Sequence, residues 1–372
     1  MRLLLYEWCC SGGLLGGDAS LSTEGRMMLE ALAADAARTD LDIAVLQAAD
    51  ASLDLPPHVR RIMVVGDDDR GPLAAEARAA DWTIVVAPES DGILLDRARA
   101  VRQAGGRLLA PADHVIELAA DKQATITRLA GRGIPVPPGR SLASGELLPR
   151  GFRLPAIRKA RGGCGGDSLA ILCEPAAPVP VPTRVEPLVV GTAVGVSLIC
   201  GPGFSHALPP MRQRFTAGDA PRYLGGEPLA DPSAAARAVS LAQRAAAAVT
   251  ADGGWLGVDL ILGSRADGRD DRVLEINPRL TSSFVGLARL FPGSLVAAMI
   301  EAANGRRPTL AATAESLSRG RFRIPTAASP HVNLPRRTPF AATRARFVKT
   351  ACSSESVSGS ISTVVRGSTL AY

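Results

Sequence analysis

Short apolar runs alternate with helix-like periods in the first third of the chain. Buried strands are predicted at Leu3–Tyr6, Ile43–Leu46, Arg61–Val65, Thr83–Val86 and Arg107–Leu109. Helices between them are predicted at Thr23–Arg38, Pro72–Ala80 and Leu94–Ala104. This alternation is typical of βαβ units that build a parallel sheet. The pattern therefore predicts a doubly wound α/β domain over residues 1–115.

The pattern of apolar and polar residues changes near Asp121. A helix over Asp121–Arg132 is predicted to end at Gly133, before a proline-rich segment. Further strands are predicted at Leu154–Lys159, Ser168–Cys173, Pro187–Val190, Val194–Cys200, Trp255–Leu262 and Arg272–Ile276. Long helical periods cover Ser233–Ala251 and Leu295–Ala303, and Glu174–Thr183 is interpreted as a connector. The middle of the chain is thus predicted to be α+β.

Composition limits the function classes. The 372 residues are 47% apolar, which suits a globular α/β protein, and no apolar run reaches the roughly 18–20 residues of a membrane span. Six cysteines without a CxxC pair and four histidines argue against a zinc finger or a histidine-rich metal site. The start does not resemble a secretory signal, so we expect a cytoplasmic protein with reduced thiols.

Charge is unevenly distributed along the chain. The net charge is +6, and basic residues are enriched over Arg306–Lys349, where Glu315 is the only acid. This segment lacks a recognisable nucleic-acid-binding module, so we expect neither nucleic acid nor membrane as a partner. Residues 311–372 are predicted to form a basic, Ser/Thr-rich extension that is partly disordered. Of the 42 basic residues only Lys122, Lys159 and Lys349 are lysines, which hints at positions that require a compact ammonium group.

The segment Glu275-Ile-Asn277-Pro-Arg279, with Asp259 on the preceding strand, carries the strongest chemical signal. Residues two apart on a strand point to the same side, so Glu275 and Asn277 present two oxygen ligands together. Asp259 lies where a paired strand could add a third. Few hard oxygen ligands suit Mg²⁺ (or Mn²⁺), whose remaining positions are filled by phosphate and water. Arg279 could reach the same phosphate.

A second signal is the sequence Ile157-Arg-Lys-Ala-Arg-Gly-Gly-Cys-Gly-Gly166. A predicted strand ends near Lys159 and runs into a loop that contains Gly162, Gly163, Gly165 and Gly166. Glycines allow the backbone to approach phosphates and direct N–H groups at them, while the lysine supplies a cation. Glycine-rich hairpin turns have similar sequences, so the prediction that this loop binds phosphate depends mainly on the predicted Mg²⁺ site downstream.

Over about residues 115–305 the chain resembles ATP-grasp enzymes. The family pattern falls on Lys122, on Lys159 with its glycine loop, on the hinge Glu186-Pro-Leu188-Val, and on the Asp259, Glu275 and Asn277 trio. The resemblance implies a pre-ATP-grasp domain at 1–115, a small lobe at 116–185 and a large lobe at 186–310. ATP would be held by Lys122, Lys159, the loop glycines, Glu186 and Leu188, with Lys159 and Arg279 as catalytic cations. Where many members carry a ribose-binding acid, this chain has Ala193.

The opening YEWCCSGG and the segments MRQRF and EINPRLTSSFVGL are similar to tyramine–glutamate ligases of methanofuran biosynthesis and their bacterial relatives. That resemblance implies an amide-forming ligase in cofactor biosynthesis, with L-glutamate and tyramine as substrates and a homodimer as a candidate assembly. Two alternatives remain: another amino-acid or dipeptide ligase of the same fold, and a nucleotide-binding regulator that has lost catalysis. Substrate-dependent ADP release separates the enzyme from the regulator.

Overall fold

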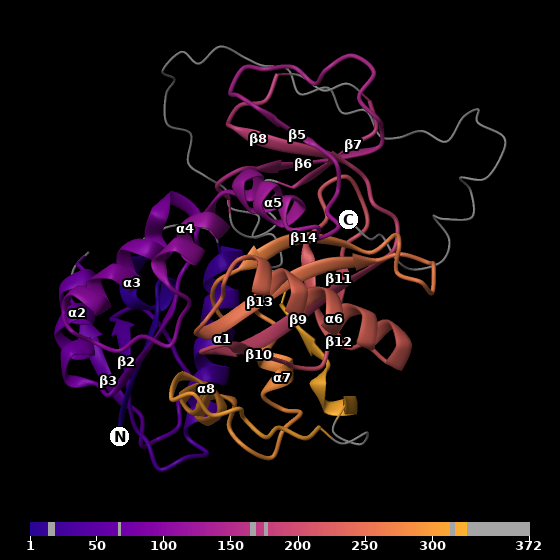
Figure 1. Cartoon of the computed structure of the whole chain (residues 1–372). Coiled ribbons are helices and arrows are strands. Elements are labelled where there is room, and N and C mark those ends of the chain that lie inside the picture. Colours follow the sequence, from indigo (N-terminus) through magenta and orange to yellow (C-terminus); the bar gives the residue numbers. More distant parts are fainter. Residues whose placement is uncertain (14–18, 66–67, 164–168, 175–177, 313–316, 326–372) are drawn as a thin grey trace, which may run out of the picture.

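The computed structural model describes residues 1–13, 19–65, 68–163, 169–174, 178–312 and 317–325. Within these residues the chain forms three sheets. Figure 1 shows the N-terminal domain on the left, a small lobe at the top, and a large lobe below the small lobe and to the right of the N-terminal domain. No helix in the described ranges is both long and apolar enough to cross a membrane.

The N-terminal sheet is parallel and doubly wound, as predicted. Its order is β3 (Arg60–Val64), β2 (Asp42–Ala48), β1 (Arg2–Glu7) and β4 (Trp82–Val86). The helices are α1 (Ala19–Ala36), α2 (Arg70–Ala79) and α3 (Ile93–Gln103), with short helical turns η1 (Cys9–Gly13) and η2 (Ser90–Gly92) after β1 and β4. Leu3 and Leu5 pack with α1, whereas Leu4 and Tyr6 pack with α2 and α3. Alternate side chains of β1 therefore serve opposite faces of the sheet.

The small lobe is an antiparallel sheet with the order β5 (Arg140–Leu142), β8 (Thr183–Pro187), β6 (Ala156–Ala160) and β7 (Ala170–Leu172). Helices α4 (Asp113–Ala120) and α5 (Lys122–Gly131) lead into it from the N-terminal domain. Asp121 caps α5, because its carboxylate accepts the N–H groups of Gln123 and Ala124. The first residue of α5, Lys122, is thereby fixed at the start of the helix.

The large lobe is built on a seven-stranded sheet among the described residues. Its path is β14 (Arg272–Asn277), β13 (Gly254–Leu262), β9 (Thr192–Gly201), β11 (Met211–Phe215), β12 (Tyr223–Pro228) and β15 (Phe322–Arg323), and β10 (Phe204–Ala207) pairs with β9. Helix α6 (Pro232–Ala248) packs on one face, and α7 (Phe284–Leu287) and α8 (Leu295–Ala303) pack on the other. A short turn, η3 (Ser318–Gly320), precedes β15.

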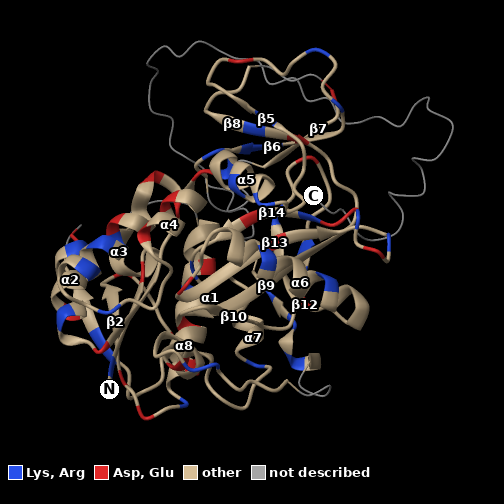
Figure 2. Ribbon diagram, viewed as in Figure 1, with Lys and Arg blue, Asp and Glu red and all other residues tan. Residues whose placement is uncertain are grey.

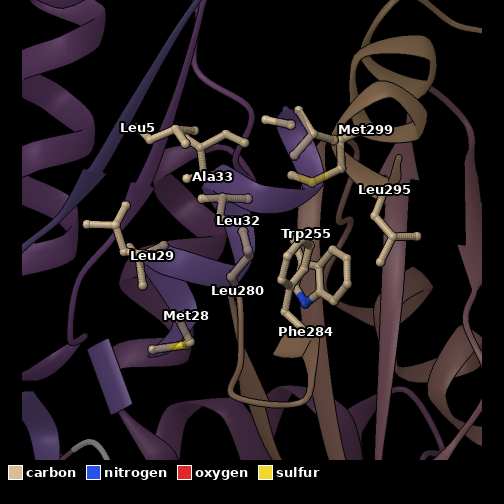
Figure 3. Close-up of a cluster of buried hydrophobic side chains, with 14 of the residues drawn as sticks. Leu5, Met28, Leu29, Leu32, Ala33, Trp255, Leu280, Phe284, Leu295 and Met299 are labelled. Carbon is tan, nitrogen blue, oxygen red and sulfur yellow. The ribbon is translucent and has the colours of Figure 1, made fainter. Parts of the chain in front are cut away.

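Helix α1 joins the N-terminal domain to the large lobe through a shared hydrophobic core (Figure 3). Leu29 and Leu32 of α1 belong to the same buried cluster as Trp255, Phe284 and Met299. At one end of this joint, buried Asp35 of α1 accepts hydrogen bonds from the Ser294 hydroxyl at 2.7 Å and the Val296 N–H at 2.9 Å. Asp35 thus helps to cap α8, a helix of the other lobe.

Several predicted elements need correction. The run Arg107–Leu109 makes a single bridge, Thr83 to Leu108, rather than a strand. The strand predicted at Pro187–Val190 instead covers Thr183–Pro187. Its Arg184 and Glu186 are buried because they pair with each other, and hydropathy cannot anticipate a buried charge pair. Helix α4 and strands β5, β10, β11, β12 and β15 are not among the predicted elements; all have at most eight residues, and β12 has two adjacent glycines.

Candidate active site

One cleft collects most of the residues that the sequence singled out. It lies where β6 and α5 of the small lobe face β9, β11, β13 and β14 of the large lobe and the start of α1. Its lining includes Lys122, Lys159, Asp259, Glu275, Asn277 and Arg279. Gly162, Gly163, Glu186 and Leu188 are not among the lining residues, and Gly165 and Gly166 lie outside the described residues.

The acidic side of the cleft comes from two paired strands. Asp259 on β13 stands directly opposite Glu275 on β14, and the ladder shifts just after Asp259. Asn277 follows two residues after Glu275, and its Nδ2 donates to Asp259 Oδ2 at 2.9 Å. Gln213 on β11 donates Nε2 to the other Asp259 oxygen at 2.8 Å. The two carboxylates and the amide therefore all line this side of the cleft, and their role as metal ligands stays a prediction.

The electrostatics of this side favour a bound cation. Burial raises the pKa of Asp259 and the nearby Glu275 carboxylate adds to this, while hydrogen bonds from Asn277 and Gln213 oppose it, so that the pKa is raised to about 6. Burial also tends to raise the pKa of Glu275, but the neighbouring Lys122 and Lys159 outweigh it and the pKa is lowered. Two carboxylates this close repel each other unless positive charge lies between or beside them.

The donor set at Asp259 fits Mg²⁺ better than a softer metal. Within the described residues no group of three or more His, Cys, Asp or Glu side chains is arranged around a common point. Two carboxylates and one amide oxygen are hard ligands and too few to saturate the ion. Mg²⁺ is typically bound in this way, with phosphate and water completing its octahedron.

Two lysines project into the cleft from the small lobe. Lys122 Nζ lies 2.8 Å from Glu275 Oε1 and also donates to the Gly163 carbonyl. Lys159 Nζ lies 2.7 Å from Glu186 Oε1 and 3.4 Å from the Leu274 carbonyl oxygen. Both side chains are nearly buried. Figure 2 shows the basic segments of β6 and β8 above the acidic segment of β14. The structure therefore brings Lys122, Lys159 and Gly163 together. The two lysines line the cleft, whereas Gly163 does not.

The hinge residues Glu186 and Leu188 are engaged in contacts with neighbouring residues, and their role in adenine binding stays a prediction. Glu186 is buried, and its second carboxylate oxygen accepts from Arg184 Nε at 2.9 Å. Arg184 also donates to the Gln123 side chain and to the Pro137 carbonyl. The Leu188 N–H donates to the Pro155 carbonyl at 2.9 Å. Glu186 thus acts as a counter-ion for Lys159, and the Leu188 amide is engaged within the lobe.

Arg279 enters the cleft from the loop after β14. Its Nε lies 3.0 Å from Oε1 of Glu89, and Nη1 donates to the Leu280 carbonyl at 3.1 Å. Further along this loop, the Ser283 hydroxyl lies 2.7 Å from the Thr281 hydroxyl. Ser282 donates to Glu24 Oε2 of α1 at 3.0 Å. This loop therefore places a guanidinium and a row of hydroxyls beside the acidic side.

Sequence reasoning gave no role to Met211, Gln213, Phe215 and Tyr223, which line the cleft. The sequence could have indicated three of them, because Met211, Gln213 and Phe215 are two residues apart along β11 and therefore face the same side of the strand. Burial raises the pKa of Tyr223, and the nearby Asp259 and Glu24 carboxylates raise it further, so its hydroxyl stays protonated. The cleft therefore has an apolar, aromatic side opposite the lysines.

Comparison with known families gives this site a class. Residues 119–283 match the ATP-grasp domain, and residues 43–116 match the pre-ATP-grasp 3 domain. The chain therefore contains an ATP-grasp domain preceded by a pre-ATP-grasp domain. Its fold is the ATP-grasp fold with a pre-ATP-grasp N-terminal domain, and its enzyme class is that of the ADP-forming ATP-grasp ligases.

Solved structures share this architecture at low sequence identity. An ATP-grasp superfamily protein from Archaeoglobus fulgidus is 21% identical, with a TM-score of 0.64 over 82% of this chain and 89% of that one. An L-amino acid ligase from Bacillus licheniformis is 15% identical, with a TM-score of 0.59 over 81% and 73% of the two chains. The biotin carboxylase domain of Hydrogenobacter thermophilus 2-oxoglutarate carboxylase, solved with MgADP, is 15% identical, with a TM-score of 0.61 over 85% and 72%. No curated protein matches the chain.

Proposed function

We propose that this enzyme uses ATP to activate a carboxylate as an acyl phosphate and then joins the acyl group to an amine. The observation that carries the proposal is the meeting of Lys122, Lys159, Arg279 and the Asp259–Glu275 pair in one cleft. Phosphoryl transfer requires cations around the phosphates and little covalent chemistry from the protein. This cleft provides fixed cations on one side and cation ligands on the other.

The residues have distinct tasks in this reaction. Lys122 and Lys159 would bind ATP phosphates, releasing their present contacts with Glu275 and Glu186. Asp259, Glu275 and Asn277 would hold Mg²⁺, which neutralises phosphate charge when bound. The substrate carboxylate attacks the γ-phosphorus, and ADP leaves. Arg279 would stabilise charge on the transferred phosphoryl group and then on the tetrahedral centre that forms as the amine displaces phosphate.

For the substrates we propose L-glutamate and tyramine, in the synthesis of a methanofuran-type one-carbon cofactor in the cytoplasm. The support is the resemblance of the N-terminal segment and of the Glu275–Leu287 segment to tyramine–glutamate ligases. The cleft is compatible with an aromatic amine, because the Phe215 and Tyr223 rings lie on its apolar side in a tilted contact with a centroid distance of 5.5 Å. Glu24 at the same end would attract an ammonium group.

The direct test is ADP release by purified protein with Mg²⁺-ATP and a matrix of amino acids and amines. We expect release only when both an acid and an amine are present, and the largest rate with glutamate and tyramine. Chelation of Mg²⁺ should stop the reaction, and mass spectrometry should show the γ- or α-glutamyl amide. Absence of ADP release with every pair would contradict the ligase proposal.

A second candidate is a ligase that joins two amino acids. It is favoured by the similarity of the fold to that of an L-amino acid ligase. The same matrix distinguishes the two, because a dipeptide ligase should prefer an amino acid over tyramine as the acceptor. The catalytically inactive regulator is disfavoured because the cleft retains both lysines, Arg279 and the paired carboxylates.

A further inference from the structure

A contact between domains reaches Arg279 from the N-terminal domain. Glu89 lies just after β4, at the carboxyl end of the parallel sheet, and is 7% exposed. Its Oε1 lies 3.0 Å from Arg279 Nε, and the Arg279 side chain is 15% exposed. Ligands of doubly wound sheets bind at this end of the strands. Glu89 thus extends from the edge of one domain to the catalytic loop of another.

The surroundings of Arg279 explain why such a contact matters. Its charge acts on Asp259 and Glu275, because the guanidinium lowers the pKa of both carboxylates. These acids would attract the guanidinium toward the predicted Mg²⁺ site, where a like charge is unfavourable. Glu89 Oε1 forms an ion pair with Arg279 Nε at 3.0 Å rather than an aligned hydrogen bond, and the Leu280 carbonyl accepts from Nη1. The guanidinium is therefore held by one charge–charge contact at Nε and one hydrogen bond at Nη1.

We infer that Glu89 is a positioning residue that aims Arg279 at the transferred phosphoryl group and makes catalysis dependent on the N-terminal domain. The inference rests on the proposed ligase function. Glu89 acts through Arg279 and does not itself touch the reacting atoms. A nearly buried ion pair restrains the guanidinium, since the attraction between opposite charges is stronger where water is largely excluded. Without Glu89, Arg279 would move toward Asp259 and Glu275.

Kinetics of three variants test this role. Glu89→Gln should lower kcat about 10- to 100-fold, because small misplacement of a catalytic group has an effect of this size. The KM for ATP should stay unchanged, and Glu89→Asp should recover part of kcat. The matched control is Glu76→Gln, which removes a carboxylate from an exposed ion pair with Arg60 on the same domain. Equal kcat in Glu89→Gln and Glu76→Gln would overturn the inference.

A double variant tests whether the effect passes through Arg279. If Glu89 acts only by orienting Arg279, Glu89→Gln should cause no further loss of kcat when it is added to Arg279→Lys. Independent and multiplicative losses would show that Glu89 acts elsewhere, and would overturn the inference. Thermal unfolding of each variant separates this result from a general loss of folded protein.

A measurement without turnover separates this inference from the proposed function. The Nε–Hε resonance of Arg279, assigned by its absence in Arg279→Lys, should shift in Glu89→Gln and stay in place in Glu76→Gln. An unshifted resonance would overturn the inference whatever the enzyme catalyses. A shifted resonance together with no ADP release from the wild-type protein would retain the contact and contradict the ligase proposal instead.

Discussion

The large lobe has two joints of different physical character. Its joint with the N-terminal domain is a continuous hydrophobic core, in which Leu29 and Leu32 pack near Trp255 and Phe284 (Figure 3). Its joint with the small lobe is mixed. Leu129 of α5 and Ile134 belong to the large lobe's second hydrophobic cluster, whereas the contacts nearest the cleft are polar. Lys122 pairs with Glu275, Lys159 contacts the Leu274 carbonyl, and the Val273 N–H donates to the Pro135 carbonyl.

This difference indicates which parts of the enzyme are rigidly joined. The β5–β8 sheet of the small lobe has its own small core of Leu142, Ala156, Val179 and Val185, separate from the large-lobe clusters. Apolar burial contributes most of the free energy that holds two bodies together. We therefore expect the N-terminal domain and large lobe to behave as one body. The small lobe would respond to ligand, because ATP phosphates and Mg²⁺ compete for the groups that connect it.

The largest expected effect comes from removing the acid that serves both the polar contacts between the lobes and the predicted metal site. Glu275→Ala should reduce ADP formation by at least ~1,000-fold, the size of effect seen when a main electrostatic element of a site is removed. Circular dichroism should show an intact fold. Glu117→Ala, which removes a half-exposed carboxylate paired with Arg99, is the control and should retain full activity. Wild-type turnover in Glu275→Ala would refute the metal assignment.

A substitution at the centre of the hydrophobic joint should lower the stability of the protein. Phe284 is fully buried, with its ring centroid 5.3 Å from that of Trp255. Phe284→Ala should lower the free energy of unfolding by about 3–5 kcal/mol, through lost burial and the cavity left behind. Denaturant titration should still show the N-terminal domain and large lobe unfolding in one transition. Separate transitions for the two would contradict the view that they form one body.

A smaller effect is expected at the polar end of the same joint. Asp35→Ala leaves the Ser294 hydroxyl and the Val296 N–H without their buried acceptor. The loss should be about 1–3 kcal/mol in the free energy of unfolding, the usual penalty for buried donors without an acceptor. Asp54→Ala, on the exposed surface of the same domain, is the control and should change stability by less than ~0.5 kcal/mol. Equal stability of the two variants would show that the hydrophobic contacts alone make the joint.

The smallest effect on stability is expected from the lysine that connects the lobes. Lys122→Met removes the 2.8 Å pair with Glu275 and should weaken ATP binding about tenfold, equivalent to ~1.4 kcal/mol. The midpoint of thermal unfolding should change little, because Lys159 and Arg279 remain as compensating charges near Glu275 when Lys122 is removed. Calorimetric titration with a non-hydrolysable ATP analogue measures the affinity. A large loss of stability with unchanged affinity would make Lys122 structural.

Much of this arrangement could be predicted from the sequence where a residue's role follows from local spacing. Glu275 and Asn277 lie on one side of a strand because they are two residues apart, and the βαβ alternation predicted the parallel sheet. Roles that depend on distant partners could not be predicted. The sequence predicts Glu186 at an adenine hinge but does not indicate that its carboxylate contacts Lys159 and Arg184. Nothing in the local sequence of Glu89 indicates that it meets Arg279, 190 positions later.

The position of α1 has a consequence for how such an enzyme can be rearranged. The helix follows the first strand of the N-terminal domain, yet it fills the core of the large lobe. Residues 119–283 expressed alone would therefore expose Trp255 and Leu280 to water. Recombination between relatives should succeed when α1 and the large lobe come from the same parent. The segment that must be exchanged as a whole is then larger than the nucleotide-binding domain, because it includes α1. Any acceptor specificity that Glu24 provides would be exchanged together with the loop that Glu24 contacts through Ser282.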